Sequence, residues 1–216
     1  MGRTGRLWGV AALWAAAGWA SAGAAAASAS ADFADFGNTA ASPDARYVAS
    51  WVLESADHGG QPFAIVDKKD ARIYVFDGRG RLSGASAALL GQTSGDQSAP
   101  GVGEHTQAGR VPVAERTTPS GRFVSEPGRN LSGEHVVWVD YDAAFAIHRL
   151  RPGASLRQRE ARLASATPQD NRASLGCVVV PVAFYSNVVQ PLLGHERAVV
   201  YVLPEERSAR ELFNAL

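Results

Sequence analysis

The chain has 216 residues, with 21 basic and 21 acidic side chains, so its formal net charge at pH 7 is zero. This balance excludes the clustered basic excess of a nucleic-acid-binding protein, and the single cysteine excludes an internal disulfide. The length suits about one domain, large enough to bury a core without disulfides.

The N-terminus predicts a Sec-type export signal. Arg3 and Arg6 give a positive start, an apolar segment follows over residues 7–19, and small residues come next. We place the signal peptide at residues 1–27, with cleavage between about residues 22 and 27. A membrane anchor is the alternative, because the uncharged stretch could span a bilayer. The mature protein is therefore expected to be periplasmic or otherwise extracytoplasmic, touching the membrane only through an uncleaved signal.

Residues 28–61 predict a leader followed by a docking helix. The leader is small and polar, and Pro43 can open a helix because its missing N–H would be unpaired there anyway. Apolar residues then recur at helical spacing, namely Tyr47, Val48, Trp51 and Val52. We expect the helix to run from about residue 44 to residue 56.

From residue 62 onward, short β-branched and aromatic runs alternate with turn residues, which is typical of strands and hairpins. The strands are expected at residues 63–66, 72–76, 82–90, 136–140, 144–148, 178–180 and 198–203. Helices are expected at residues 155–166, 182–193 and 205–216. Because strands dominate the middle of the chain, we predict one mainly-β domain over residues 62–204, with a few peripheral helices and a C-terminal helix at residues 205–216.

Residues 92–121 form the least regular part of the chain. They are rich in Gly, Ser, Thr and Pro. Loops of this length inside a domain are either functional or disordered.

Cys177 is the only cysteine, and an unpaired thiol in an exported protein is a reactive group, an intermolecular link or a buried hydrophobe. The three valines after it favour an inert, buried cysteine. Gly176, directly before it, favours a reactive one, because a glycine turn lets a substrate approach the backbone closely.

A catalytic thiol also needs a base and donors for the oxyanion. His148 ends a predicted strand, where a β scaffold can hold a side chain in place. A hydrogen-bonded structural histidine is the alternative for this residue.

Three segments, in this order, resemble the catalytic domain of the L,D-transpeptidases, also called the YkuD domain. They are Ile65-Val66-Asp67-Lys68 with the strand that follows, Thr118-Pro119-Ser120-Gly121-Arg122-Phe123, and His148 with Ser174-Leu175-Gly176-Cys177. The resemblance covers about residues 62–203. It implies a β-sandwich or barrel with peripheral helices.

The resemblance also implies roles for single residues. Cys177 matches the acylated nucleophile and His148 matches the base. Gly176 and Cys177 match the region whose backbone amides face the oxyanion. Ser174 matches the Ser or Thr of the motif, so Gly176 and Ser174 are the candidates that shape the site. Candidate substrate-binding residues are Asn171, Arg172 and Arg149, although Arg172 could equally make a structural salt bridge.

Two positions depart from the family pattern. Leu175 stands where the motif has histidine, and Val179 stands where it has Asn or Arg. Neither position matches the nucleophile or the principal base. The absence of the motif's inner histidine therefore need not abolish the chemistry.

The function implied is a peptidoglycan L,D-transpeptidase. Its cysteine would form a thioester with a stem peptide and pass it to an amine, giving a cross-link or attachment to a protein lysine. The resemblance implies that no metal or organic cofactor is needed, and the histidines show no close-spaced ligand pattern for a zinc site. The alternatives are a non-catalytic peptidoglycan-binding scaffold that retains the fold, and an L,D-carboxypeptidase that passes the thioester to water.

Overall fold

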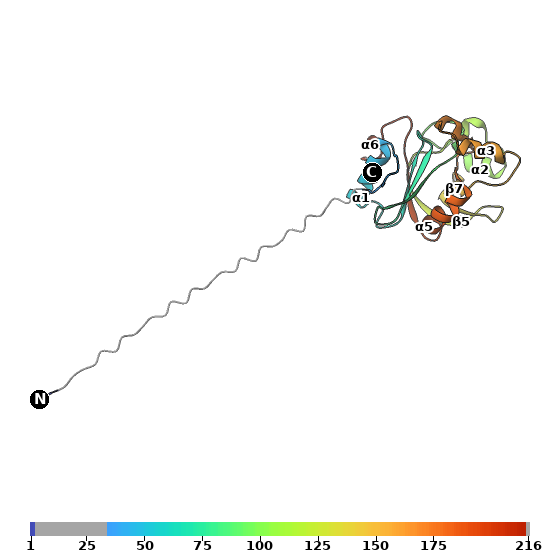
Figure 1. Ribbon diagram of the computed structural model, residues 1–216. Coiled ribbons are helices and arrows are strands. Elements are labelled where there is room, and N and C mark those ends of the chain that lie inside the picture. The colour runs from blue at the N-terminus through green and yellow to red at the C-terminus, as the bar shows by residue number, and fades with distance from the viewer. Residues whose placement is uncertain (3–33, 215–216) are drawn as a thin grey trace. The chain divides into compact units, whose positions relative to one another are not determined.

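An eight-stranded sheet organises the computed structural model, which describes residues 1–2 and 34–214 (Figure 1). Its strand order is β3-β2-β1-β10-β5-β6-β7-β9. The strands are β1 (Phe63–Asp67), β2 (Arg72–Phe76), β3 (Leu82–Ala87), β5 (Gly121–Arg129), β6 (His135–Asp140), β7 (Phe145–Arg149), β9 (Val178–Val180) and β10 (Ala198–Val202). A small second sheet pairs β4 (Leu90–Gly91) with β8 (Arg172–Ser174). The predicted mainly-β fold is confirmed, whereas the predicted signal peptide lies, beyond residue 2, outside the described residues.

The two ends of the large sheet are linked, so the sheet is nearly closed. Leu89, just after β3, donates its N–H to the Val179 carbonyl of β9 at 2.8 Å, and the Val179 N–H donates to the Leu89 carbonyl at 2.9 Å. β9 is therefore held by β7 on one side and by the segment after β3 on the other. This fixes the position of Cys177, which directly precedes β9.

The central strands are apolar on both faces because both faces are covered. On β1, Ala64 and Val66 point into the core inside the sheet, whereas Phe63 and Ile65 point into a second core on the outer face. Helices α1 (Pro43–Ser55) and α6 (Ala209–Phe213) supply side chains to that second core. Burial on both faces explains why the strand is a continuous apolar run and does not alternate.

The ends of both covering helices follow from local chemistry. The Ser42 hydroxyl accepts a hydrogen bond from the Ala45 N–H at 3.0 Å and so caps α1, close to the predicted start. The predicted C-terminal helix begins later than expected, at Ala209. The reason is that the N–H groups of Glu205 and Glu206 bind the buried Asp96 carboxylate at 2.8 and 3.0 Å.

Strand β5 was missed by the sequence prediction because Pro127 and Gly128 resemble turn residues. β5 pairs with β10 through residues 121–125 and then with β6 through residues 126–129. Pro127 therefore lies where the strand has only one recorded partner, and this is where a proline is tolerated in a sheet. The predicted strand over residues 82–90 is likewise divided, because β3 ends at Ala87 and β4 begins at Leu90.

Helices occupy the remaining connections. The irregular region contains α2 (Val102–Gln107) and the short helix η1 (Val113–Glu115), and η2 (Pro168–Asn171) precedes β8. The predicted helix at residues 182–193 is one continuous run of α4 (Val182–Phe184), the π-helical η3 (Tyr185–Val189) and α5 (Gln190–Leu193). None of the helices in the described part of the chain is long and apolar enough to cross a membrane.

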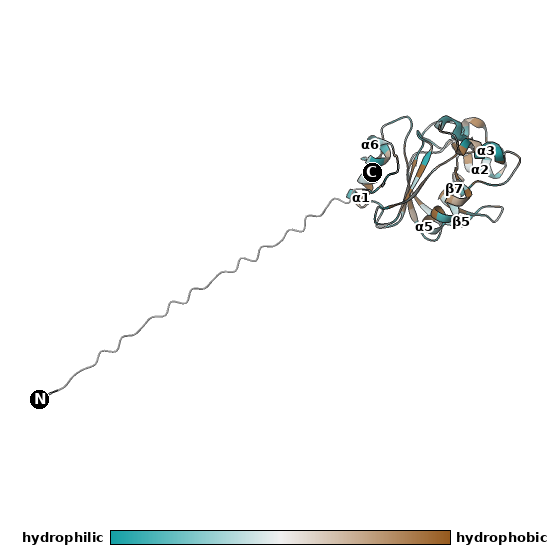
Figure 2. Ribbon diagram, in the orientation of Figure 1, coloured by the Kyte–Doolittle hydropathy of each residue, from teal (hydrophilic) through white to brown (hydrophobic). Residues whose placement is uncertain are grey.

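Helix α3 (Leu156–Leu163) is strongly hydrophilic, as Figure 2 shows. Its two leucines, Leu156 and Leu163, nevertheless pack on a small apolar cluster that includes the candidate nucleophile. The cluster contains Leu89, Leu150, Val179, Ala173 and Cys177. This hydrophilic helix is thus anchored beside Cys177.

Candidate active site

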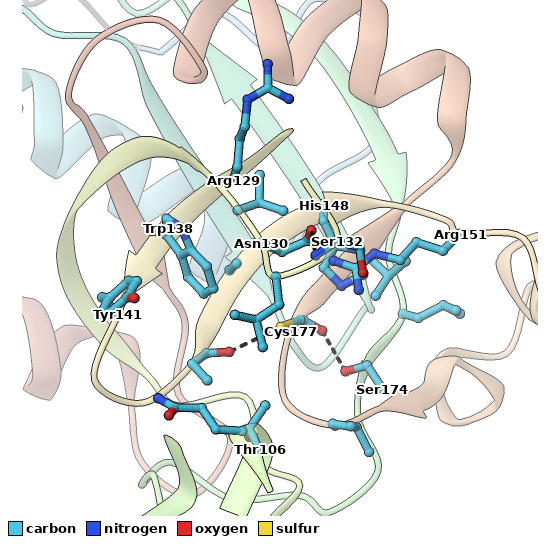
Figure 3. Close-up of a pocket in the computed structure, with 18 of the residues that line it drawn as sticks. Thr106, Arg129, Asn130, Ser132, Trp138, Tyr141, His148, Arg151, Ser174 and Cys177 are labelled. Carbon is cyan, nitrogen blue, oxygen red and sulfur yellow. Dashed lines mark hydrogen bonds between the residues drawn. The ribbon is translucent and has the colours of Figure 1, made fainter. Parts of the chain in front are cut away.

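A cavity of about 600 Å³ contains both Cys177 and His148 in its lining (Figure 3). The other lining residues come from α2, from the β5–β6 hairpin, from the segments around β7, from α3 and from residues 173–179. These parts are far apart in the sequence, so the cavity exists only in the folded chain. Leu131, at the tip of the β5–β6 hairpin, is 95% exposed and forms part of its rim.

The parallel pairing of β7 with β9 brings the two candidate residues together. Ile147 pairs with Val178 and His148 with Val179, which places Cys177 level with Ala146. Alternate residues of a strand point to the same face, so Ala146 and His148 share the cavity face of β7. The small side chains of Ala144 and Ala146 leave space for the thiol, which donates to the Ala144 carbonyl at 3.5 Å.

The hydrogen bonding of His148 fixes which ring nitrogen is the base. Its Nδ1 lies 2.8 Å from the carbonyl oxygen of Arg149. A carbonyl can only accept, so Nδ1 carries the proton and Nε2 keeps its lone pair. Neutral His148 is therefore ready to accept a proton at Nε2, and the backbone performs the orienting role whatever the side chain of Arg149.

Burial keeps both groups neutral at pH 7. It lowers the pKa of His148 from 6.5 to about 4, and the charge of Arg151 acts in the same direction. Burial also raises the pKa of the Cys177 thiol, although a hydrogen bond from Ala146 and the charge of Arg151 partly oppose this. The resting pair is thus a thiol and an imidazole and not a thiolate–imidazolium pair.

The turn before Cys177 is held by Ser174. The Ser174 hydroxyl accepts from the Gly176 N–H at 3.1 Å and donates to the Cys177 carbonyl at 2.6 Å. Gly176 has a φ of +134°, a conformation that favours glycine. The Gly176 amide is therefore bound within the turn, and an oxyanion role for the Cys177 amide stays a prediction.

Thr118 connects this turn to a buried charge network. Its hydroxyl donates to the Gly176 carbonyl at 2.8 Å and accepts from the Gly91 N–H at 2.9 Å. The Thr118 carbonyl accepts from the Lys68 ammonium at 3.0 Å. Lys68 and Thr118 are both fully buried, so the chain of bonds is shielded from water.

Every N–H donor of the Lys68 ammonium has a hydrogen-bond partner. Its three donors bind the carbonyls of Gly95 and Thr118 and the carboxylate of Asp96, the last at 2.9 Å. Glu205 lies 3.6 Å away and binds Arg172 as well. Lys68 and Thr118 belong to two of the three segments that resemble the family. The structure brings these two segments together behind Gly176.

Replacing Thr118 by valine is expected to lower the free energy of unfolding by about 2–6 kcal/mol. The change keeps the shape but leaves the Gly176 carbonyl and the Gly91 N–H buried without a partner, at about 1–3 kcal/mol each. Thr118→Ser is the matched control, because it keeps the hydroxyl and loses one methyl group, at about 1 kcal/mol. Urea unfolding of the wild-type protein and the two variants measures this free energy. Equal losses of stability in Thr118→Val and Thr118→Ser would contradict the role of the Thr118 hydroxyl in holding the turn.

The three candidate substrate-binding residues do not line the cavity. The Asn171 amide donates to the Ala88 carbonyl at 3.0 Å. The guanidinium of Arg172 donates to the Lys68 carbonyl at 3.1 Å and binds Glu205, which is the structural salt bridge considered above. Arg149 pairs with Glu134 at 2.5 Å. A substrate role for these side chains stays a prediction.

The two departures from the family motif both line the cavity but differ in exposure. Leu175 is 49% exposed and lines the cavity, so an apolar side chain faces the space that a histidine would make polar. Val179 is 4% exposed and packs in the apolar cluster with Leu89 and Leu150. Val179 therefore contributes packing beneath the thiol.

The polar and aromatic lining residues that the sequence reasoning missed include Asn130, Trp138, Arg151 and Arg159. Arg151 follows His148 by three residues at the end of a strand, and that proximity was the available signal. The others reach the cavity from a hairpin and a helix whose packing no local pattern reveals. Within residues 1–2 and 34–214, no group of three or more His, Cys, Asp or Glu side chains is arranged to hold a metal ion.

Comparison with protein-family models gives no match, and comparison with curated proteins gives none either. Among solved structures, the chain is similar to an L,D-transpeptidase from Xylanimonas cellulosilytica, with 17% identity over 66% of this chain and 60% of that one, and a TM-score of 0.42. It is also similar to the helical cell shape determining protein Pgp2 from Campylobacter jejuni, with 16% identity over 74% and 55% of the two chains and a TM-score of 0.43.

An Enterococcus faecium L,D-transpeptidase is similar as well, with 16% identity over 66% of this chain and 50% of that one, and a TM-score of 0.34. The chain thus spans half to three fifths of the length of these structures. Several similar structures are L,D-transpeptidases, the family that the sequence motifs resemble.

Proposed function

We propose that this protein is an extracytoplasmic cysteine acyltransferase that forms a thioester with peptidoglycan stem peptides. The observation that carries the proposal is that His148 on β7, and Cys177 directly before the neighbouring parallel strand β9, line one cavity. The His148 tautomer, with Nδ1 donating to the Arg149 carbonyl, supports it. The substrate class is taken from the resemblance of the three sequence motifs.

In the first half of the reaction, the Cys177 sulfur attacks the carbonyl carbon of the L,D amide. The S–H proton passes to Nε2 of His148 as the S–C bond forms, since neither group is charged at rest. The tetrahedral intermediate then collapses, the C–N bond breaks, and His148 returns the proton to the departing nitrogen. A thioester and a free terminal amino acid result.

In the second half, an acceptor attacks the thioester. His148 takes a proton from the acceptor amine, the C–S bond breaks, and the proton returns to the sulfur, so the enzyme is restored. A stem-peptide amine gives a cross-link and a protein lysine gives an attached protein, whereas water gives a carboxypeptidase. All three outcomes use the same thiol and base.

Incubating the mature protein with a tetrapeptide stem tests the proposal. We expect release of the terminal D-alanine, together with an intact-mass increase equal to the acylated stem peptide. A carbapenem, which acylates active thiols of this kind, is expected to add its own mass at Cys177. A protein that gains no mass from either compound is not an acyltransferase of this class.

The non-catalytic scaffold is the second candidate, and the apolar Leu175 at the cavity favours it. A pulldown on purified sacculi separates the two candidates when it is run beside the mass measurement. Binding to sacculi without an adduct indicates the scaffold. An adduct indicates the acyltransferase.

A further inference from the structure

The lining of the cavity is cationic. Among the described residues that line it, Arg129, Arg151 and Arg159 carry positive charge, and none is Asp or Glu. Glu134 lies behind this wall and is shared by Arg149 at 2.5 Å and Arg151 at 2.8 Å. One carboxylate therefore faces two guanidinium groups, and Arg159 adds a third charge that the structure pairs with no acid among the described residues. An excess of positive charge beside a thiol favours an anionic ligand.

Two of these arginines lie on the side of the base. Arg151 follows His148 by three residues, and Figure 3 shows it beside His148, whereas Arg129 points away from the thiol. Arg159 projects from α3 and is fixed by donating to the Arg151 carbonyl at 2.8 Å. The pair is thus held together by the backbone of the segment after β7.

Three donors at this wall are buried and form no hydrogen bond with any residue that the structure describes, namely Nδ2 of Asn130, Nε of Arg151 and Nε of Arg159. The Arg151 Nε lies 2.8 Å from Glu134 as an ion pair, without the alignment of a hydrogen bond. Buried donors are ordinarily satisfied, so a group that binds there gains hydrogen bonds that the free protein does not make. Carboxylate oxygens are acceptors without a donor of their own, and arginine binds them in a bidentate manner.

We propose that Arg151 and Arg159 form a carboxylate subsite, which takes the free carboxylate of the residue that leaves when Cys177 is acylated. The inference rests on the proposed function. The leaving nitrogen must lie near His148, which protonates it. In an α-amino acid the carboxylate carbon is only about 2.5 Å from that nitrogen, as bond lengths dictate. A cation beside His148 is therefore placed to bind it.

The subsite makes the acyl donor a peptide that ends in a free acid. An internal amide, or a terminal carboxamide, presents no charge at this position. The protein would then remove or exchange only the last residue of a stem and leave longer peptides uncut. Arg151 and Arg159 are in this sense specificity-determining residues.

The first test uses two alkylating reagents of nearly equal size, iodoacetate and iodoacetamide, which differ in charge. We expect Arg159→Gln and Arg151→Gln each to lower the ratio of the iodoacetate to the iodoacetamide labelling rate of Cys177 by roughly 10-fold. Arg157→Gln is the matched control, because Arg157 is an exposed residue of the same helix and does not line the cavity. Circular dichroism checks that every variant is folded.

The second test compares a tetrapeptide stem with its C-terminal carboxamide. We expect the wild-type protein to prefer the acid by about 10- to 150-fold in kcat/KM, and Arg159→Gln to lose most of this preference. Equal rates on both donors would overturn the subsite while leaving the acyltransferase intact. No turnover of either donor refutes the proposed function instead, and the labelling ratio still decides whether the anion site exists. An unchanged ratio in all variants, or no labelling by either reagent, overturns the subsite.

Discussion

Replacing Cys177 by alanine is expected to abolish the release of D-alanine from a tetrapeptide stem, with a loss on the order of a millionfold. The reason is that no other thiol exists in the chain, so no residue can form the thioester. The carbapenem adduct should disappear together with the activity. Intact mass and D-alanine release measure both losses in the same sample.

The fold is expected to survive this change. Cys177 is only partly buried, and its one recorded side-chain hydrogen bond is the weak contact of 3.5 Å to the Ala144 carbonyl. We therefore expect the free energy of unfolding to fall by about 1 kcal/mol. Cys177→Ser is the control, since it keeps a similar volume and a donor. Full activity in either variant would end the thioester mechanism.

Replacing His148 by alanine is expected to slow the labelling of Cys177 by iodoacetamide at pH 7 by about 10²- to 10⁴-fold, the usual contribution of a general base. Without the imidazole, only the thiolate reacts, and burial raises the pKa of this thiol. The rate in the variant should then rise about tenfold per pH unit through the neutral range.

The wild-type protein should show a different pH profile. A base must be neutral to accept a proton, and His148 stays neutral until the pH falls to its pKa of about 4. The labelling rate should therefore be nearly constant from about pH 5 to pH 7 and fall as the pH drops through 4. Three charged groups act on the imidazole, namely Glu134, Arg151 and Arg159, and the Arg149 carbonyl accepts its hydrogen bond. A tenfold rise per pH unit in both proteins would remove His148 from the role of base.

The β1–β2 hairpin and helix α1 were predictable because the sequence patterns that specify them are local. The hairpin of β1 and β2 follows from two apolar runs around a polar turn, and α1 follows from Pro43 and helical spacing. β5 was not predictable, because Pro127 is compatible with a strand only where the partner strand changes. That change depends on β10, more than 70 positions further along the chain.

Residue type alone determined which groups can do the chemistry. One cysteine after a glycine and one histidine at a strand end leave few choices of nucleophile and base, because few side chains can act as either. The motifs around Lys68 and Thr118 were visible as well, but only the structure shows that both meet behind Gly176.

Only the tertiary structure decided the electrostatics of the cavity. The free Nε2 of His148, the raised pKa of the thiol and the arginines at the wall all depend on burial and on contacts between distant segments. A sequence pattern records the spacing along one element, whereas charge and solvation depend on what surrounds a group from every side. For this protein the sequence identified the candidate nucleophile and base, and the packing of β7, β9 and α3 decided their protonation and the positive charge beside them.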